Sequence, residues 1–171
     1  TPDGTIGFFD PTYSLYSVLA DIRDCRKRAI PLPDDFSWVA PPSDFEASAF
    51  LLTNPNAPTS VQYPTEEVRR FCRRFPGVVL IDEAYADFAE TNCMDIATAP
   101  ENANTLVMRT LSKSYSLAGL RFGYCVGPER LIDALFKIKD SYNVDAIAQR
   151  VALAAFKDRP YHRKTVAKVV K

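Results

Sequence analysis

Short apolar segments recur along the chain, and each is followed by a segment with a helical pattern. Residues 78–81 are purely aliphatic, and Ala49–Thr53 is apolar up to its closing threonine, without the alternation of a half-exposed strand. Strands that are apolar on both sides belong to sheets covered on both faces, which are mostly parallel with helical crossovers. The pattern therefore predicts an α/β protein with three layers, α/β/α, around a mostly parallel sheet.

The remaining elements follow from the same periodicities. We expect further strands at residues 5–9, 106–108 and 122–126, and helices at residues 15–28, 64–75, 128–139 and 146–157. Thr65 is a candidate N-cap, because Glu66 and Glu67 follow it and suit the first turn of a helix. The stretch 31–44 contains four prolines and is expected to be a loop, with Trp38 as a packing anchor.

Length and charge restrict the possible classes of protein. With 171 residues the chain is about one domain long, and we predict a single domain over residues 1–171. Its 21 basic and 21 acidic residues cancel, which argues against a nucleic-acid or membrane surface. The chain starts at Thr1 and stops within a helical pattern, so we expect this domain to be incomplete at both ends.

The cysteines and the single histidine do not suggest a metal centre. Cys25, Cys72, Cys93 and Cys125 form no Cys-x-x-Cys pair, and His162 is the only histidine. We therefore predict no metal and no disulfide framework. Small buried thiols in a reducing, cytoplasmic environment are expected instead, together with a surface position for His162.

Lys113 differs from the other lysines in its surroundings. It follows the strand-like run Asn104-Thr-Leu-Val-Met-Arg109 and precedes a glycine-containing turn, whereas the other seven lysines lie in segments with helical or terminal character. A lysine is usually a solvent-exposed charge. At the carboxyl end of a buried strand, however, it lies where α/β proteins bind ligands, and a partly desolvated amine can attack a carbonyl group. Lys113 is therefore our candidate nucleophile.

Other polar groups also lie where predicted strands end or begin. Asp82 comes directly after four aliphatic residues, and a carboxylate is costly to bury unless it meets a cation or a hydrogen-bond donor. Tyr85 lies three positions later. Arg121, eight residues after Lys113, is expected to open a strand, where its guanidinium can hold a phosphate with two hydrogen bonds. Two hydroxyl groups precede the lysine, those of Thr110 and Ser112.

One ligand matches this combination of groups. Pyridoxal phosphate presents an aldehyde to an amine, a ring nitrogen to a carboxylate, a 3′ oxygen to a phenol, and a phosphate to arginine and hydroxyl groups. A carboxylate at the ring nitrogen keeps that nitrogen protonated, so the ring can accept the electrons released when the substrate Cα–H bond breaks. The residues therefore predict pyridoxal phosphate as the cofactor.

Four segments, in this order, resemble the large domain of fold-type-I pyridoxal-phosphate aminotransferases, and most closely the histidinol-phosphate aminotransferase subfamily. They are an aromatic segment, an Asn-Pro loop, an aspartate–tyrosine segment and a lysine segment, at residues 10–16, 54–60, 81–85 and 110–121. The Asn-Pro loop is weak on its own, but the lysine segment is specific, and the four span most of the chain. The resemblance implies a fold of the aminotransferase large-domain type.

The resemblance also implies a role for each site residue. Lys113 would form a Schiff base with pyridoxal 5′-phosphate and then move the proton between the substrate Cα and the cofactor. Asp82 would bind the pyridine nitrogen and Tyr85 the 3′ oxygen, which makes these three the catalytic residues. The ring stack and the phosphate contacts would come from Tyr13 and from Thr110, Ser112 and Arg121.

The Asn-Pro loop departs from the family pattern. The family usually places an asparagine directly before Pro-Thr-Gly, where its amide reaches the 3′ oxygen, but Ala57 occupies that position here. Asn56 stands one residue earlier and is kept as a candidate cofactor contact. Ser60 replaces the glycine that ends the loop. Tyr85 is therefore expected to be the main contact of the 3′ oxygen.

The resemblance implies transamination in two half-reactions, with histidinol phosphate as the amino donor and 2-oxoglutarate as the 2-oxo acid, in a homodimer. Two alternatives remain open. An enzyme like threonine-phosphate decarboxylase would use the same cofactor to break another bond. A non-catalytic module that senses pyridoxal phosphate would be recognised by an adjoining helix-turn-helix domain. The glycine-rich phosphate turn and the arginine that grips the substrate are expected outside these residues.

Overall fold

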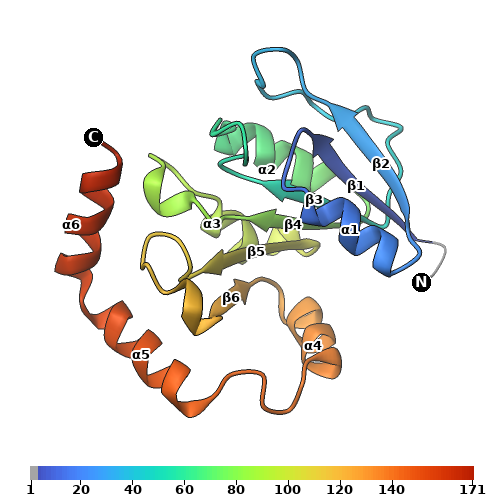
Figure 1. The fold of residues 1–171 in the computed structure, drawn as a ribbon. Helices are drawn as coiled ribbons and strands as arrows, with labels where there is room; N and C mark the ends of the chain where they lie inside the picture. The colour runs from blue at the N-terminus through green and yellow to red at the C-terminus, as the bar shows by residue number, and fades with distance from the viewer. Residues whose placement is uncertain (1–3) are drawn as a thin grey trace.

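The computed structural model describes residues 4–171, and this part of the chain contains one six-stranded sheet in the order β2-β1-β3-β4-β5-β6 (Figure 1). The strands are β1 (Thr5–Asp10), β2 (Arg26–Pro31), β3 (Ala49–Thr53), β4 (Val78–Asp82), β5 (Thr105–Thr110) and β6 (Gly123–Val126). Strands β1 to β5 run parallel to one another, and β6 runs antiparallel to β5. The mostly parallel α/β/α fold is thus confirmed.

Helices connect the strands and continue beyond the last one. The α-helices are α1 (Leu15–Ile22), α2 (Thr65–Arg74), α3 (Met94–Thr98), α4 (Glu129–Ile138), α5 (Ala146–Lys157) and α6 (Arg159–Val169). Three short 3₁₀ helices join them within the described residues, namely η1 (Ala86–Phe88), η2 (Pro100–Asn102) and η3 (Ala118–Leu120). The predicted strands and helices after residue 49 therefore exist, with ends that differ from the predicted ones by at most two residues.

One face of the sheet forms the main core. Its side chains pack against α2 and α3 in a single cluster that includes Phe50, Leu52, Val79, Ile81 and Val107, all with 0% exposure. On the other face, Phe8 of β1 packs against Tyr16 of α1, with ring centroids 6.5 Å apart. On the same face, alternate residues of the central strands β3 and β4 are only half-buried. The sheet is therefore more completely covered on the α2 and α3 side.

Two sequence-based boundaries were wrong. The helix predicted over residues 15–28 ends at Ile22, Asp24 has a φ of 50°, and Arg26–Pro31 forms the parallel edge strand β2. The basic residues of that strand suit the edge of a sheet, where charged side chains discourage pairing with another chain. Thr65 is not the N-cap of α2, because that helix begins at Thr65 and Pro64 precedes it as the cap.

Trp38 is a packing residue, as predicted. Its ring meets those of Phe9, Tyr63 and Phe71, with centroids 5.5, 5.3 and 6.3 Å away. These edge-to-face contacts attach the proline-rich loop to the main core, because aromatic pairs in this geometry add to the burial of apolar surface.

The cysteines fit the sequence-based expectation only in part. Cys72 and Cys93 are buried, and burial raises the pKa of their thiols to about 11 and about 12. Cys25 and Cys125 are only partly buried.

Within residues 4–171, no cluster of three His, Cys, Asp or Glu side chains could hold a metal ion. No helix in the same range is long and apolar enough to cross a membrane.

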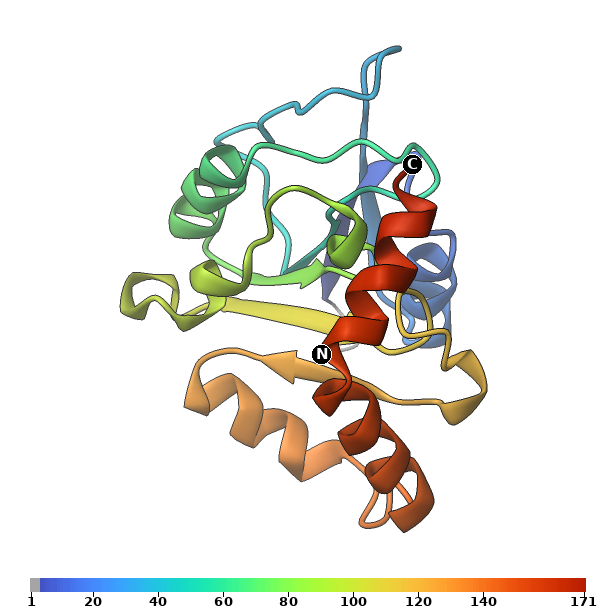
Figure 2. The same cartoon turned by 90° about the vertical axis from the view of Figure 1, so that its left-hand side faces the viewer.

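Helices α5 and α6 form an arm beyond the carboxyl ends of the parallel strands. In Figure 1 the arm curves around the side toward which β4 and β5 point, and Figure 2 views the molecule from that side, with α6 in front. The arm therefore lies on the side of the sheet where ligands bind in parallel α/β proteins. Within the arm, the side chain of Asp158 caps α6 by accepting a hydrogen bond from the Tyr161 N–H at 3.2 Å.

Candidate functional site

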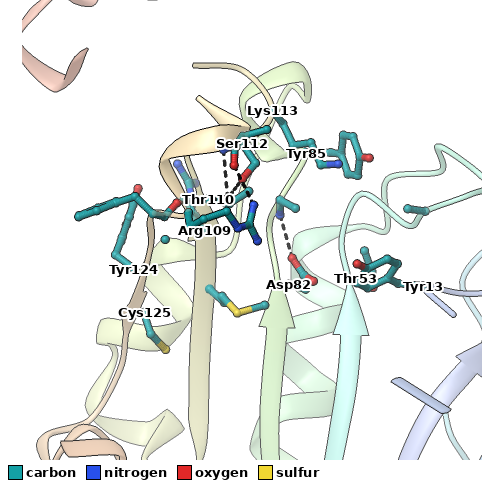
Figure 3. A pocket seen from close by; sticks show the side chains of 17 residues that line it. Tyr13, Thr53, Asp82, Tyr85, Arg109, Thr110, Ser112, Lys113, Tyr124 and Cys125 are labelled. Carbon is teal, nitrogen blue, oxygen red and sulfur yellow. Dashed lines mark hydrogen bonds between the residues drawn. The ribbon is translucent and has the colours of Figure 1, made fainter. Parts of the chain in front are cut away.

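A cavity of about 660 Å³ opens at the carboxyl ends of β3, β4 and β5. Seven of the eight residues proposed from the sequence line it, namely Tyr13, Asp82, Tyr85, Thr110, Ser112, Lys113 and Arg121. Figure 3 shows Asp82 at the end of its strand, with Lys113 and Tyr85 above it and Tyr13 to one side. The parallel register explains the gathering, because Asp82 of β4 lies opposite Thr53 of β3 and Met108 of β5.

Asp82 is a buried carboxylate at the base of the cavity. Its residue is only 6% exposed, and one oxygen accepts a hydrogen bond from the Ala84 N–H at 3.0 Å. Burial raises the pKa of Asp82 above its ordinary value, although the Ala84 N–H, the Tyr16 hydroxyl and the charge of Lys113 act in the opposite direction. Burial therefore favours a proton, or a hydrogen-bond donor, on this carboxylate.

Tyr16 and Thr53 belong to this site, and the sequence reasoning missed both as site residues. The Tyr16 hydroxyl donates to Asp82 Oδ2 at 3.1 Å and lies 2.6 Å from Thr53 Oγ1. Burial and then the nearby Asp82 charge raise the pKa of Tyr16 far above its ordinary value, so it stays a neutral hydrogen-bond donor. The signal was available in part, since Tyr16 ends the aromatic segment at residues 10–16. The long-range contact with Asp82 was not.

Lys113 lies in the turn after β5, three residues beyond the end of the strand. Its Nζ is 5.0 Å from the centroid of the Tyr85 ring. Two backbone hydrogen bonds close the turn, from the Ser116 N–H to the Lys113 carbonyl at 2.9 Å and from the Leu117 N–H to the Leu111 carbonyl at 3.0 Å. The lysine side chain is thus held by a compact loop beside a phenol, at the mouth of the cavity.

Hydroxyl groups and a guanidinium also line the cavity. The Thr110 hydroxyl donates to Ser112 Oγ at 2.9 Å and accepts a hydrogen bond from the Ser112 N–H at 3.1 Å. Arg121 donates to the Ala118 carbonyl at 2.8 Å from a left-handed backbone position with a φ of 52°. Arg121 was predicted to open a strand, but this prediction was wrong, because β6 begins at Gly123. The left-handed turn at Arg121 delays the strand by two residues.

Asn56 does not line the cavity. Its amide donates to the Pro11 carbonyl and to Thr59 Oγ1, both at 3.0 Å, and its carbonyl oxygen accepts from the Thr12 hydroxyl at 2.9 Å. Ala57 lines the cavity instead. These three bonds engage both ends of the Asn56 amide in holding the Asn-Pro loop, so its contact with a cofactor stays a prediction without geometric support.

Arg109 is a second cavity residue that the sequence reasoning missed. Its guanidinium donates to Glu83 Oε2 through Nε at 2.9 Å and through Nη2 at 2.7 Å. Burial works to lower the pKa of Arg109, but the Glu83 charge and hydrogen bonds raise it above its usual value. Both bonds reach the same oxygen of Glu83, and Oε1 accepts a hydrogen bond from the Cys93 N–H, so each oxygen of this fully buried carboxylate has a partner.

His162 is not the surface residue that was expected. Its side chain is only 15% exposed, and its ring stacks on that of Tyr115, with centroids 3.9 Å apart and an interplanar angle of 13°. The expectation failed because α6 packs against the ring of Tyr115, a residue that lies far from His162 in sequence.

The chain is similar to aminotransferases in sequence and in structure. The family model for aminotransferase class I and II matches residues 1–171. The histidinol-phosphate aminotransferases of Geobacter sp. (strain M21) and Geobacter sulfurreducens are each 42% identical, over 96% and 91% of this chain and 46% and 44% of their own lengths. The chain therefore belongs to the aminotransferase class I and II family, and it spans about half the length of these relatives.

Solved structures show the same fold. A histidinol-phosphate aminotransferase from Sinorhizobium meliloti in complex with pyridoxal-5′-phosphate matches with a TM-score of 0.86 at 23% identity, over 98% of this chain and 47% of that one. An aspartate aminotransferase from Thermus thermophilus with maleate matches with a TM-score of 0.84 at 20% identity, over 99% and 47%. Both likenesses establish the fold of the described residues.

Proposed function

We propose that this chain is the cofactor-binding large domain of a pyridoxal-phosphate-dependent aminotransferase. One observation carries the proposal. A buried carboxylate, a lysine amine, a phenol and a hydroxyl–guanidinium cluster, contributed by separate segments of the chain, line one cavity of about 660 Å³. Family membership and the chemistry of these groups support the same cofactor, pyridoxal 5′-phosphate. Bound in the cavity, this group would supply an aldehyde for an amine and a ring that accepts the electron pair of a breaking Cα–H bond.

Asp82 and Tyr85 would orient the cofactor and adjust its electronic state. Because burial raises the pKa of Asp82, its carboxylate gains most from a protonated ring nitrogen that forms a charge-assisted hydrogen bond. Tyr16 and the Ala84 N–H hold the two carboxylate oxygens, so Asp82 keeps one orientation. Tyr85 would place its phenol at the 3′ oxygen, while Tyr13 would pack its ring on the cofactor.

Lys113 would bind the aldehyde and then act as the base that moves the substrate proton. Its position beside Tyr85, with Nζ 5.0 Å from the ring centroid, places an amine and a phenol together over the end of β4. Thr110, Ser112 and Arg121 would hold the phosphate, because they supply two hydroxyl groups and a planar set of N–H donors. The family model spans all of these residues.

The proposed substrates are histidinol phosphate as the amino donor and 2-oxoglutarate as the amino acceptor. The support comes from the relatives with about 42% identity that are named histidinol-phosphate aminotransferases. We also propose a cytoplasmic homodimer, completed by the half of the protein that the relatives have in addition. Large apolar side chains on α1 and α4 are exposed in this part of the chain, among them Val18 at 48% and Phe136 at 62%, and such surface favours a partner.

Borohydride reduction of the full-length protein with bound pyridoxal phosphate tests the cofactor site. The expected result is a stable label on the peptide that contains Lys113, and no such label in the Lys113→Ala variant. A Lys137→Ala variant is the matched control, because Lys137 lies on the surface of α4 away from the cavity and should leave the label unchanged. Label on another lysine would overturn the assignment. Turnover with histidinol phosphate, compared with other amino donors, then tests the substrate separately.

A further inference from the structure

Asp87 lies next to the site without lining its cavity. Its carboxylate contacts three side chains, those of Ser114, Arg109 and His162. It belongs to η1, two residues after Tyr85. Its Oδ2 accepts a hydrogen bond from the Ser114 hydroxyl and lies 3.5 Å from His162 Nε2. Its Oδ1 lies 3.6 Å from Arg109 Nη1. One partly buried carboxylate thus joins the segment after β4, the turn after β5 and helix α6.

The Ser114 bond ties down the lysine loop, which we define as residues 111–117. Ser114 is adjacent to Lys113 and only 3% exposed. The loop is closed internally by two backbone hydrogen bonds, but its Ser114 hydroxyl reaches outside the loop, to Asp87. Because Tyr85 and Asp87 share a short segment, this bond fixes the lysine amine relative to the phenol that faces it. Loosening it would allow Lys113 to move while Asp82 and Arg121 kept their own contacts.

Helix α6 meets the same place from outside. His162 stacks on Tyr115 of the lysine loop with ring centroids 3.9 Å apart, and its buried Nε2 lies 3.5 Å from Asp87 Oδ2 without a hydrogen bond. A second cavity, of about 300 Å³, lies between the loop and helices α5 and α6, and His162 is among the residues that line it. The contact between α6 and the loop is therefore concentrated at a few side chains, rather than spread over a filled core, so each of these side chains matters for where α6 docks.

We propose that Asp87 is a positioning residue for Lys113, and that His162 makes the order of the lysine loop depend on the docking of α6. The inference rests on the proposed function, because Lys113 is taken as the reactive amine. Asp87 does not touch the cofactor or the substrate. It acts through Ser114, which holds the loop, while Arg109 holds Asp87 from the other side and is itself fixed by the buried Glu83.

Two losses are expected when these contacts are removed. The lysine loop should open more often, because the turn loses the hydrogen bond from its Ser114 side chain to the neighbouring segment and with it local stability. Turnover should also fall, because small displacements of a reacting group cost on the order of 10²-fold in rate. Substrate affinity should change little, since no residue that lines the cavity is altered by substitutions at Asp87 or His162.

Hydrogen–deuterium exchange of the full-length protein, resolved to peptides, tests the tie directly. The variants are Asp87→Asn, Ser114→Ala and His162→Ala, with Lys164→Ala as the matched control on the exposed surface of α6. We expect faster exchange of the lysine loop in the first three variants and unchanged exchange in the Lys164→Ala control. In His162→Ala the first turns of α6 should also exchange faster, whereas Ser114→Ala should leave them unchanged.

Steady-state kinetics of the same variants give a readout that general destabilisation would not produce. Asp87→Asn and Ser114→Ala are expected to lower kcat by about 10- to 100-fold with KM changed by less than about twofold, and the double variant should be no worse than the poorer single variant. Unchanged loop exchange in both Ser114→Ala and Asp87→Asn would overturn the proposal, as would additive losses. Should Asp87→Asn fail to fold, Ser114→Ala decides the question alone.

The two proposals fail in different ways. A wild-type protein without aminotransferase activity would overturn the proposed function, yet the exchange of the lysine loop would still show whether Asp87 and His162 hold it. Conversely, an active enzyme whose loop exchange and kcat are unaffected by Ser114→Ala keeps the proposed function and removes the positioning role.

Discussion

Ile81 and Asp82 are neighbours on β4, but they belong to two different regions of the molecule. Ile81 points into the core between the sheet and helices α2 and α3, where it has no exposed surface. Asp82 ends the strand among polar groups that are equally buried, a region we call the site rim and define as Thr53, Asn54, Asp82, Glu83 and Ser114. Burial is thus similar in the two regions, while the forces that accompany it differ.

The core is held by contacts that depend on shape and volume, and the site rim by bonds that depend on direction. Phe50 meets other phenylalanine rings in the core, and any side chain of similar size would retain part of that contact. A rim residue such as Asp82 has a small number of defined partners, and no apolar side chain can replace it. Substitutions in the core should therefore change stability, and substitutions in the rim should change function.

The strongest test of this contrast is the removal of the Lys113 amine, which lines the cavity beside the rim. Lys113→Ala in the full-length protein is expected to lower kcat about 10⁴-fold or more, as loss of a nucleophile does in other enzymes, which corresponds to about 5.5 kcal/mol of activation free energy. The melting temperature of the cofactor-free protein should hardly change, because Lys113 is exposed. Kinetics and thermal unfolding of the same preparation measure both. A large loss of stability would show that the loop depends on this side chain.

The matching change in the core should have the opposite signature. Phe50 packs against the rings of Phe9, Phe45, Phe71 and Phe75, at centroid distances of 5.3, 5.7, 4.9 and 6.0 Å. Phe50→Ala is expected to lower the free energy of unfolding by about 3–5 kcal/mol through the cavity it leaves. Urea titration measures this loss. Under conditions where the variant is folded, kcat should stay near the wild-type value, and a large fall would mean that core and rim are not separable.

Asp82→Asn is expected to have a somewhat smaller effect on the reaction. The side chain keeps its size but loses the charge that would face a ring nitrogen, and loss of one preorganised electrostatic contact typically costs about 10²–10³-fold in kcat. Cofactor should still bind through Lys113 and the phosphate contacts. Kinetics together with cofactor titration separate the two quantities. A variant with normal kcat would show that Asp82 does not pair with the cofactor ring.

The same contrast explains which parts of the structure could be predicted from the sequence. The core strands were recognisable because Ala49–Thr53 and 78–81 are apolar runs, and burial on both sides of a strand leaves that mark locally. The edge strand Arg26–Pro31 carries no such mark, since only Ile30 is buried in it. Its pairing with β1 supplies the structure, and pairing between distant residues is invisible in a local pattern.

For the site, the sequence identified the groups that face the cavity but not those that hold them. Asp82 and Lys113 were conspicuous because each is a polar residue at the end of an apolar run. Tyr16 was not, because an aromatic residue in a helix is ordinarily a packing residue, and His162 was not, because it was expected at the surface. Their partners lie 66 and 75 positions away in sequence. Second contacts of this kind follow from the fold and can only be found once the chain is folded.

Tyr16→Phe should reveal the value of one such supporting contact. The substitution keeps the ring but removes the hydroxyl that donates to Asp82 at 3.1 Å. We expect kcat to fall by about tenfold, since a hydrogen bond to a charged group contributes about 1.5 kcal/mol or more. In the Asp82→Asn background the same substitution should cost much less, because the charge it supports is gone. Equal losses in both backgrounds would place the effect of the Tyr16 hydroxyl elsewhere, for example in its hydrogen bond with Thr53.

The smallest expected effect concerns the stability of the cofactor-free protein as a function of pH. Burial raises the pKa of Asp82 in the folded protein above 3.8, the value expected in the unfolded chain. In the window between these two pKa values the folded state binds more protons than the unfolded state, so this group makes stability fall as pH rises. Above the window Asp82 is a charged group held in a site that disfavours its charge, and this cost persists at neutral pH.

Asp82→Asn should remove that cost, so the cofactor-free variant is expected to be more stable than the wild type at neutral pH. The difference should shrink as pH is lowered through the window and vanish below the pKa of the unfolded chain, because both side chains are then neutral. Denaturant titrations at a series of pH values measure it. A variant that is less stable at neutral pH would mean that the bonds from Ala84 and Tyr16 outweigh burial, and that Asp82 stabilises the rim in the way Ile81 stabilises the core.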